Sequence, residues 1–531
     1  MKLKLKLIIT VITSIMFAGT LFPQNLPKTY NINRNKKIGK NSAYSAPNSN
    51  GITDIIAMGD TVWLGTDEGV SLTTDGGNNW INFTGTPAFR YEGASALGYD
   101  KYNGVFWAAT ANDTNTSEGT LPRGSGLKYT SDLGKTWNSI PQPVDADSDT
   151  VIVYGNNRIP TLGVTVPEQN VIYDIGFTPN TIWIASWAAG LRKSSDMGKS
   201  WQRVVLPLDD MDSVKPADTL NSCYYPIPKN TVCSTTNNNL LGFSIAVVDS
   251  LTIYVGTAGG INKSTDGGIS WIKFNHLNET NPIAGDWVAA LIYNQYNHTL
   301  WAATRPANGS TEIYAVSYSI DGGLNWTTTL PNQTIENFAV QNNRVIAAAD
   351  EDAFMTSDQG LNWITPGIIK DANTGITLNT NTFYSAAFKE NNIWLGSSEG
   401  LAELTGSTSG WIGTWKTFTA SQPLSSSSSN TYAYPNPFNP NTDILKIKYS
   451  TNGNSVPVTI RIFDFSMHIV RTVIQSALRG NPTHVVDNSS GTIDYWDGKN
   501  DRGSVVPNGV YFYRVDAGSL KPVYGKVLVM H

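Results

Sequence analysis

Residues 130–137 read TSDLGKTW and carry the pattern that decides the fold, Ser/Thr-x-Asp-x-Gly-x-x-Trp. Five further stretches fit it: TTDGGNNW (73–80), SSDMGKSW (194–201), STDGGISW (264–271), SIDGGLNW (319–326) and TSDQGLNW (356–363). A motif repeated along a chain indicates an array of similar units, each of which buries its apolar face against the next. We therefore expect one repeat domain over most of the sequence.

A second pattern precedes each of these motifs and gives the number of units. It occurs as TVWLGT (61–66), VFWAAT (105–110), TIWIAS (181–186), TIYVGT (252–257), TLWAAT (299–304), RVIAAA (344–349) and NIWLGS (392–397). The last copy is followed by TGSTSGW (405–411), a degenerate motif that has lost its Asp. Alternating apolar residues between Gly, Asn and Asp turns predict four short strands in each unit, which is the pattern of a propeller blade. The fold predicted is all-β, with a seven-bladed β-propeller at 50–419.

The eight-residue motif resembles the Asp-box, or BNR, repeat of sialidases, sortilin-type receptors, xyloglucanase-type hydrolases and photosystem-assembly propellers. We expect it to be structural: its Asp accepts hydrogen bonds from turn amides, its Gly takes a positive φ, and its Trp packs beneath the hairpin. These residues are Asp75, Asp132, Asp196, Asp266, Asp321 and Asp358, with Trp80, Trp137, Trp201, Trp271, Trp326 and Trp363. The Trp residues of the second pattern share one strand position and are expected between blades: Trp63, Trp107, Trp183, Trp301 and Trp394.

The C-terminal part of the chain differs in character from the repeats. A Ser-rich linker at 420–432 leads into alternating strands at 433–531, which predict a small Ig-like β-sandwich. Its motifs YPNPF (434–438), WDG (496–498) and PNGVY (507–511) resemble the sorting domain of type IX secretion cargo. They equally resemble the overlapping flagellar hook-assembly-type Ig-like domain, although Ser466-Met467 stands where the family usually has a Gly. An inter-domain spacer is the plainer alternative.

The N-terminus has the composition of a signal peptide. Lys2, Lys4 and Lys6 precede an apolar run that is short for a membrane span, so we assign residues 1–24 as the signal peptide. Together with the sorting-domain resemblance, this implies passage through the periplasm and across the outer membrane by the type IX secretion machinery. We expect a secreted or cell-surface protein.

Charge and cysteine content limit the partners. The net charge of −5, without a basic cluster beyond the N-terminus, argues against nucleic acid as a partner. The two cysteines, Cys223 and Cys233, favour a disulfide in an exported protein, with free thiols as the alternative. We expect no cofactor and a monomer.

The loops indicate which face carries function. Turns between the first and second strands of each unit are short, and the Asp-boxes join the third strand to the fourth on the same side. The long insertions should therefore lie on the opposite face, where loops on a rigid scaffold form binding sites. They are roughly 111–124, 141–170, 206–240, 276–286, 305–311 and 367–380. Ligand-face candidates are Arg90, Arg123, Arg158, Trp187 and Arg305.

Three site chemistries are open on that face. Asp54, Asp174 and Asp286 on inner strands are candidates for the paired carboxylates of a glycoside hydrolase, with turn pairing as the alternative. The segment RIP (158–160) is similar to a sialidase arginine motif but lies after the second box instead of before the first. Asp145, Asp147 and Asp149 alternate as in a calcium loop but lack its Gly and Glu, so a solvated acidic loop is the alternative.

We expect a non-enzymatic binding protein whose ligand is an unidentified glycan or protein. A secreted sialidase-like or xyloglucanase-like glycoside hydrolase on the same scaffold is the alternative, because propellers host many functions.

Overall fold

The computed structural model describes residues 43–44, 46–420 and 431–531, apart from gaps at 91, 117–118, 227–232, 234, 308, 310, 379, 435, 442–443, 452–453, 481–485 and 488–490. The signal peptide predicted at 1–24 and most of the linker predicted at 420–432 lie outside the described residues. In the part of the chain that the structure describes, no helix has the length and apolar character of a membrane-spanning segment.

The described residues from Ile52 to Phe418 form a β-propeller of seven antiparallel sheets, called blades 1 to 7 below, so the all-β prediction is confirmed. Blade 1 contains β2 (Ile52–Met58), β3 (Thr61–Thr66), β4 (Gly69–Thr73) and β5 (Trp80–Asn82). Blade 2 contains β6 (Gly93–Asp100), β7 (Val105–Thr116), β8 (Gly119–Thr130) and β9 (Asn138–Ile140). Blade 3 contains β12 (Ile172–Thr178), β13 (Thr181–Ser186), β14 (Gly190–Ser194) and β15 (Gln202–Arg203). Blade 4 contains β17 (Gly242–Val247), β18 (Ile253–Thr257), β19 (Gly260–Ser264) and β20 (Trp271–Phe274). Blade 5 contains β21 (Trp287–Asn294), β22 (Thr299–Arg305), β23 (Ala315–Ser319) and β24 (Thr327–Thr329). Blade 6 contains β25 (Ile335–Gln341), β26 (Arg344–Ala349) and β27 (Ala353–Thr356). Blade 7 contains β28 (Phe383–Lys389), β29 (Asn392–Ser397), β30 (Leu401–Thr405) and β31 (Thr414–Phe418).

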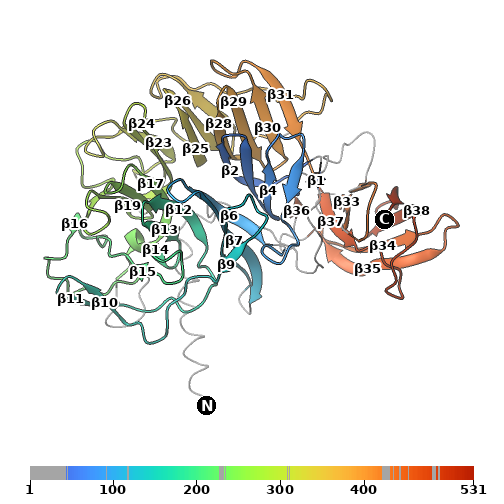
Figure 1. The fold of residues 1–531 in the computed structure, drawn as a ribbon, viewed down its shortest axis with the longest axis horizontal. Coiled ribbons are helices and arrows are strands. Elements are labelled where there is room, and N and C mark those ends of the chain that lie inside the picture. Colours follow the sequence, from blue (N-terminus) through green and yellow to red (C-terminus); the bar gives the residue numbers. More distant parts are fainter. Residues whose placement is uncertain are drawn as a thin grey trace, which may run out of the picture.

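The ring closes by packing of blade 7 against blade 1, which lie side by side in Figure 1. The rings of Trp80 and Trp394 each lie within 6 Å of Phe418, at 5.7 and 5.6 Å. The Ser385 hydroxyl of β28 also donates a hydrogen bond to the Ile52 carbonyl of β2. Each of these two sheets is made from consecutive strands, so apolar burial holds the first blade to the last without an exchanged strand.

The tryptophans of the second strands lie in the core between blades, as predicted. Trp63, Trp107, Trp183, Trp301 and Trp394 are all buried. Trp63, for example, stacks on Phe106 of blade 2 with ring centroids 4.0 Å apart. Burial of such large aromatic side chains is a main source of stability in a fold whose sheets contact only their neighbours.

The Asp-boxes form the turns between third and fourth strands and also fasten each blade to the preceding one. In the second box, Asp132 Oδ1 accepts hydrogen bonds from the Thr130 hydroxyl and the Thr136 amide. The hydrogen bonds from Thr136 are the main cause that lowers the pKa of Asp132 to about 2. Gly134 has φ +79°, and a Cβ there would lie 2.3 Å from the ring of Phe83 in blade 1. Glycine is required both for the turn and for this close approach.

Among the described residues, six blades have the four strands predicted, whereas blade 6 has three. Four short strands and a 3₁₀ turn lie outside the blades. Two of the strands extend outer edges: β1 (Ala43–Tyr44) pairs with β5, and β16 (Ser213–Val214) pairs with β20. The others form a hairpin of β10 (Val151–Tyr154) and β11 (Asn157–Pro160), and the 3₁₀ turn is η1 (Asn238–Leu240). Covering the outer edge of a blade removes unpaired backbone groups that would otherwise template aggregation.

The C-terminal residues form a sandwich of two antiparallel sheets. One sheet contains β32 (Thr431–Tyr434), β33 (Leu445–Tyr449), β36 (Val486–Asp487) and β37 (Gly491–Trp496); the other contains β34 (Val456–Phe463), β35 (Ile469–Arg479), β38 (Gly509–Ala517) and β39 (Val523–Val529). Both sheets contribute to one core that includes Phe438, Trp496 and Tyr513. In the terminal strand, Leu528 donates its amide to Asn436 Oδ1 and accepts the Phe438 amide through its carbonyl. Phe438 of YPNPF, Trp496 of WDG and Tyr511 of PNGVY, which are far apart in the sequence, therefore meet in this one core.

The sandwich contacts the propeller at blade 1. Lys446 Nζ of β33 lies 2.7 Å from Glu68 Oε2, in the turn between β3 and β4, and donates to the Asn48 carbonyl at 3.2 Å. In Figure 1 the sandwich lies beside the blue strands of blade 1. This ion pair is largely buried and fixes one point of contact between the two units.

Candidate functional site

The inner-strand aspartates proposed as hydrolase carboxylates occupy a repeated structural position. In all seven blades the first strand carries a bulge after its entry, and Asp54 and Asp174 directly follow it. Asp54 accepts the amides of Ile55 and, from blade 2, Leu97. Asp174 accepts the equivalent pair, including the Ile245 amide of blade 4 at 2.7 Å. Each carboxylate thus joins its blade to a neighbour, so turn and strand pairing explains both residues.

The third hydrolase candidate, Asp286, lies in a different environment. Burial, followed by the neighbouring Glu312 carboxylate, raises the pKa of Asp286 to about 6. Asp286 Oδ1 accepts the His276 amide at 2.6 Å, and its own amide donates to Glu312 Oε2 at 2.8 Å. Glu312 also accepts the Ala307 amide, so this carboxylate pair organises the loop that precedes it.

A pH prediction follows from the raised pKa of Asp286. Its folded-state pKa of about 6 exceeds the ordinary value of 3.8, so ionisation of Asp286 destabilises the folded protein progressively between pH 4 and 6. Asp286→Asn should therefore gain stability relative to the unsubstituted protein over that window, on the order of 2 kcal/mol by pH 7. Denaturant unfolding at several pH values measures the difference.

Asp249→Asn is the matched control for that prediction. Asp249 accepts the Leu251 and Thr252 amides in a turn of blade 4, and these bonds lower its pKa. The stabilisation of the folded protein by the Asp249 carboxylate is present above the unfolded-state pKa and is lost as the pH falls. Asp249→Asn should therefore become less stable than the unsubstituted protein as the pH rises. Parallel pH profiles for the Asp286 variant and the unsubstituted protein would contradict the prediction.

The ligand-face arginines do not share one setting. Arg90 and Arg158 are exposed, and Arg123 forms a partly exposed ion pair with Glu168 at 3.2 Å. Arg305 is only 2% exposed, and its Nη2 atom lies 2.8 Å from Glu336 Oε1 of blade 6. This corrects the prediction that Arg305 projects from the loop face. Arg305 instead forms an ion pair with a neighbouring blade inside the core. The arginine at the end of β22 neutralises a buried carboxylate of the next blade, and the spacing of residues in the sequence does not reveal such a pairing.

The acidic stretch proposed as a calcium loop is anchored by arginines. Arg192 makes a two-pronged hydrogen-bonded pair with Asp145 at 2.7 and 2.9 Å, and Arg203 lies 3.3 Å from the same carboxylate. Asp147 and Asp149 are exposed. Within the described residues, no group of three His, Cys, Asp or Glu side chains is arranged to hold a metal ion. The alternation of carboxylates therefore does not bring Asp145, Asp147 and Asp149 together as ligands, because Asp145 turns inward to neutralise buried guanidinium charge.

The long insertions are not confined to the face opposite the boxes, which corrects the loop prediction. The Tyr154 hydroxyl, in 141–170, donates to the Ile269 carbonyl inside the Asp-box of blade 4. Within 206–240, β16 pairs with β20 next to that box. Both insertions therefore run along the outer rim of the propeller, where β10, β11 and β16 lie in Figure 1. β16 pairs with the exposed edge of the fourth strand β20, whereas Tyr154 contacts a turn carbonyl through its side chain.

Two further features belong to blades 3 to 5 and the insertions between them. Cys223 and Cys233 are joined by a disulfide bond, with Cα atoms 5.0 Å apart. Tyr173, Phe243 and Trp287 form a buried aromatic cluster at the strand entries, with Trp187 packed partly against it. Sequence reasoning missed this cluster, because two of its rings lie on bulged residues that break the alternation of the first strands.

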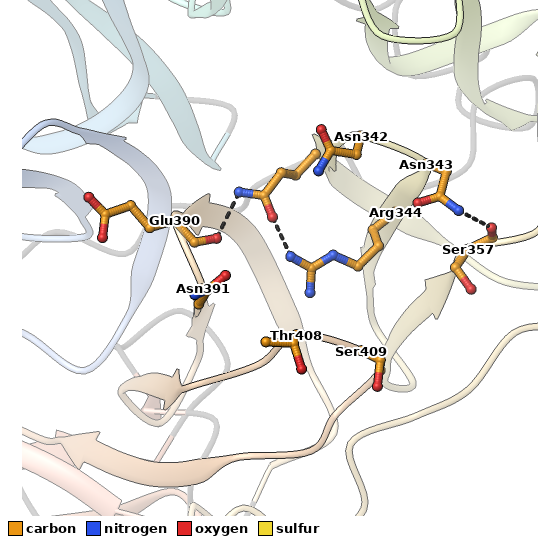
Figure 2. Close-up of a pocket in the computed structure, with 10 residues that line it drawn as sticks. Asn342, Asn343, Arg344, Ser357, Glu390, Asn391, Thr408 and Ser409 are labelled. Carbon is orange, nitrogen blue, oxygen red and sulfur yellow. Dashed lines mark hydrogen bonds between the residues drawn. The ribbon is translucent and has the colours of Figure 1, made fainter.

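A polar cleft of about 580 Å³ lies on the Asp-box side, between blades 6 and 7. Its lining comes from the turns that join first and second strands, from the sixth Asp-box and from the degenerate seventh: Gln341, Asn342, Asn343, Arg344, Ser357, Glu390, Asn391, Thr408, Ser409 and Gly410. Figure 2 shows Glu390 and Asn391 on one side, Asn343 and Ser357 on the other, and Thr408 and Ser409 below Arg344. The signal in the sequence was the loss of Asp from the seventh motif.

The degenerate box changes the shape of this corner. Strand β30 ends at Thr405 and β31 begins at Thr414, whereas β19 ends at Ser264 and β20 begins at Trp271, so the seventh turn is two residues longer. Ser407 stands in the turn without an Asp carboxylate to close it. Instead, Arg344 Nη1 of blade 6 donates to the Ser407 carbonyl at 3.0 Å. Within the turn, the Ser407 hydroxyl donates to the Gly410 carbonyl at 2.8 Å, so an internal hydrogen bond and an arginine of the preceding blade hold the longer turn.

Comparison with known proteins shows no family for this chain. No family model matches the chain, and no curated protein is similar to it in sequence. Solved structures that the search matches include PorZ, a bacterial surface component of the type IX secretion system of Porphyromonas gingivalis (14% identity, 90% of this chain and 65% of PorZ covered, TM-score 0.31). Others are an ancestral GH74 enzyme (14%, 92% and 64%, TM-score 0.48) and YCF48 from Cyanidioschyzon merolae (13%, 67% and 92%, TM-score 0.38). At identities of 13–14%, none of them assigns a site residue to this chain.

Proposed function

We propose that this chain is a non-enzymatic binding protein, delivered to the cell surface or released from it by the type IX secretion system. The observation that carries the binding assignment is the use of Asp54 and Asp174 as links between blades. Both oxygens of each carboxylate accept backbone amides, which leaves neither residue suited to act as a general acid or nucleophile.

Export rests on the two ends of the chain. The basic and apolar N-terminal residues fit a signal peptide, and the sandwich brings the residues of its sorting-domain motifs into one connected place. Partners are the secretion machinery through the sandwich and a glycan or protein through the propeller. In this proposal the protein acts as a monomer and binds no nucleic acid.

A secreted glycoside hydrolase is the second candidate, and one observation favours it. Asp286 has a pKa of about 6 and lies beside a second carboxylate, Glu312, as a general acid of a hydrolase would. Both carboxylates nevertheless accept hydrogen bonds from loop amides, so Asp286 and Glu312 also stabilise the structure of the loop.

A hydrolysis assay separates the two candidates. The purified exported chain is incubated with a panel of sialosides and β-glucans, and released sugar is measured for the unsubstituted protein, Asp174→Ala and Asp286→Asn. We expect no hydrolysis above background by any of the three proteins. Hydrolysis by the unsubstituted protein that Asp286→Asn abolishes would overturn the binding proposal, whereas Asp174→Ala controls for damage to the scaffold.

A further inference from the structure

We propose that the cleft between blades 6 and 7 binds a neutral, hydroxyl-rich ligand of the carbohydrate class. This inference rests on the proposed binding function and gives it a site and a ligand chemistry. It also moves the binding surface from the face of the long insertions to the Asp-box side, where the seventh motif departs from the other six.

One set of side chains fixes the shape of the cleft. Gln341 Nε2 donates to the Glu390 carbonyl at 2.8 Å, while its carbonyl oxygen accepts from Arg344 Nη2. Arg344 is 8% exposed and lies over the ring of Phe388, 4.8 Å from its centroid. Asn343 Nδ2 donates to the Ser357 carbonyl at 2.8 Å. The hydrogen bond from Gln341 to Glu390, drawn in Figure 2, and the packing of Arg344 on Phe388 tie blade 6 to blade 7. The bonds within blade 6, also drawn there, hold the wall of the cleft in place before a ligand arrives.

A second set of side chains has hydrogen-bonding groups to spare. The side chains of Asn342, Glu390, Asn391, Thr408 and Ser409 are exposed and make no hydrogen bond to other described residues. Amides and hydroxyls both donate and accept, and the Glu390 carboxylate accepts. A sugar hydroxyl also donates and accepts, so successive hydroxyls match a wall of mixed donors and acceptors. Polar groups held at fixed places in a cleft set the orientation of a bound ligand and give specificity.

The charges of the lining select for a neutral ligand. Arg344 and Glu390 are its two charged residues and have opposite signs, and the guanidinium is already engaged by Gln341 and Ser407. An anionic sugar would meet Glu390 without a free cation to compensate it. Nor does the lining offer an apolar pocket for the side chains of a peptide. A neutral oligosaccharide fits these groups better than either alternative.

Binding of oligosaccharides by the whole exported chain tests the inference. The probes are maltohexaose, cellohexaose, laminarihexaose and mannohexaose, with 3′-sialyllactose as the anionic comparison and an unstructured decapeptide as the peptide comparison. Isothermal calorimetry and saturation-transfer NMR should detect at least one neutral oligosaccharide with a Kd of about 1 mM or tighter. Asn391→Ala and Thr408→Ala should each raise that Kd about 3- to 10-fold, because each removes one or two neutral hydrogen bonds. Ser409→Trp, which fills the cleft, should abolish binding.

Asn180→Ala is the matched control. Asn180 is exposed in the corresponding first turn of blade 3, so its replacement should leave the Kd unchanged. The inference is overturned if none of the neutral probes binds at about 10 mM, if only the anionic sugar or the peptide binds, or if binding is the same in Ser409→Trp. In that last case the protein still binds glycans at another place, and the proposed binding function stands although this site is wrong. Hydrolysis of a probe would instead refute the proposed function.

Discussion

Replacing Arg305 by alanine should lower the free energy of unfolding of the propeller by about 3–5 kcal/mol, the largest effect expected from a single substitution in the blades. Arg305 ends β22 in blade 5, and Glu336 is the bulged residue of β25 in blade 6. Their ion pair measures 2.8 Å, and both side chains are more than nine-tenths buried. Removing the guanidinium leaves a carboxylate inside the ring without its counterion, which costs more than the pair contributes when intact.

Asp350 gives that prediction an independent readout. Burial and, next, the nearby Glu336 raise the pKa of Asp350 to about 6, while Arg305 opposes the shift. Without Arg305, the pKa of Asp350 should rise further, so the stability lost in Arg305→Ala should be smaller at low pH, where Asp350 is protonated. Unfolding by guanidinium at pH 5 and pH 8 measures this difference.

Two variants control the Arg305 experiment. Arg123→Ala breaks an ion pair whose side chains are 43% and 32% exposed, so it should cost less than about 1 kcal/mol. Arg305→Ala combined with Glu336→Gln removes the orphaned charge and should recover part of the loss. A loss below about 1 kcal/mol for Arg305→Ala alone would mean that the pair does not hold blades 5 and 6 together.

Phe438→Ala should destabilise the sandwich by about 3–5 kcal/mol, which corresponds to a fall of about 15 °C or more in the melting temperature of a domain this small. The Phe438 ring is fully buried and lies 5.8 Å from Trp496. Its backbone is bonded to both Leu528 and Met530, so disorder at this residue would also release the terminal strand β39. Calorimetry of the whole chain should show the sandwich transition moving while the propeller transition stays in place.

Phe465→Ala is the matched control in the same domain. Phe465 lies at the tip of the hairpin between β34 and β35 and is 78% exposed, so its loss should change stability by no more than about 0.5 kcal/mol. Equal effects of the two substitutions would contradict a sandwich held together through Phe438.

The repeats made most of the fold readable from the sequence. The Asp-box works through contacts within eight residues, as in the bonds of Asp132 to Thr130 and Thr136, so its spacing alone reveals the turn. The buried Trp63 and Trp107 occupy one position of an alternating strand, and alternation separates core from surface.

The parts that sequence reasoning missed depend on partners far along the chain. Asp174 is explained by an amide in blade 4, Arg305 by a carboxylate in blade 6, and Asp145 by guanidinium groups in blade 3. The position of Tyr154 at the rim depends on a turn carbonyl of blade 4. Periodicity places a residue on a strand or loop, but it does not say which charge or edge the fold will bring to it.

The cleft between blades 6 and 7 falls between these two cases. The missing Asp of the seventh motif was visible in the sequence and marked the turn as exceptional. Its consequence was not visible, because the shape of the cleft depends on Arg344 in the preceding blade and on the longer path from Thr405 to Thr414.

The most direct test of the central claim is where the protein goes in a bacterium that has a type IX secretion system. The full chain and a chain ending at residue 430 are expressed in such cells, and intact cells, medium and periplasm are probed with an antibody against the propeller. We expect the full chain on the surface or in the medium and the shortened chain, folded, in the periplasm. Surface exposure of both chains, or periplasmic retention of both, would contradict delivery through the sandwich.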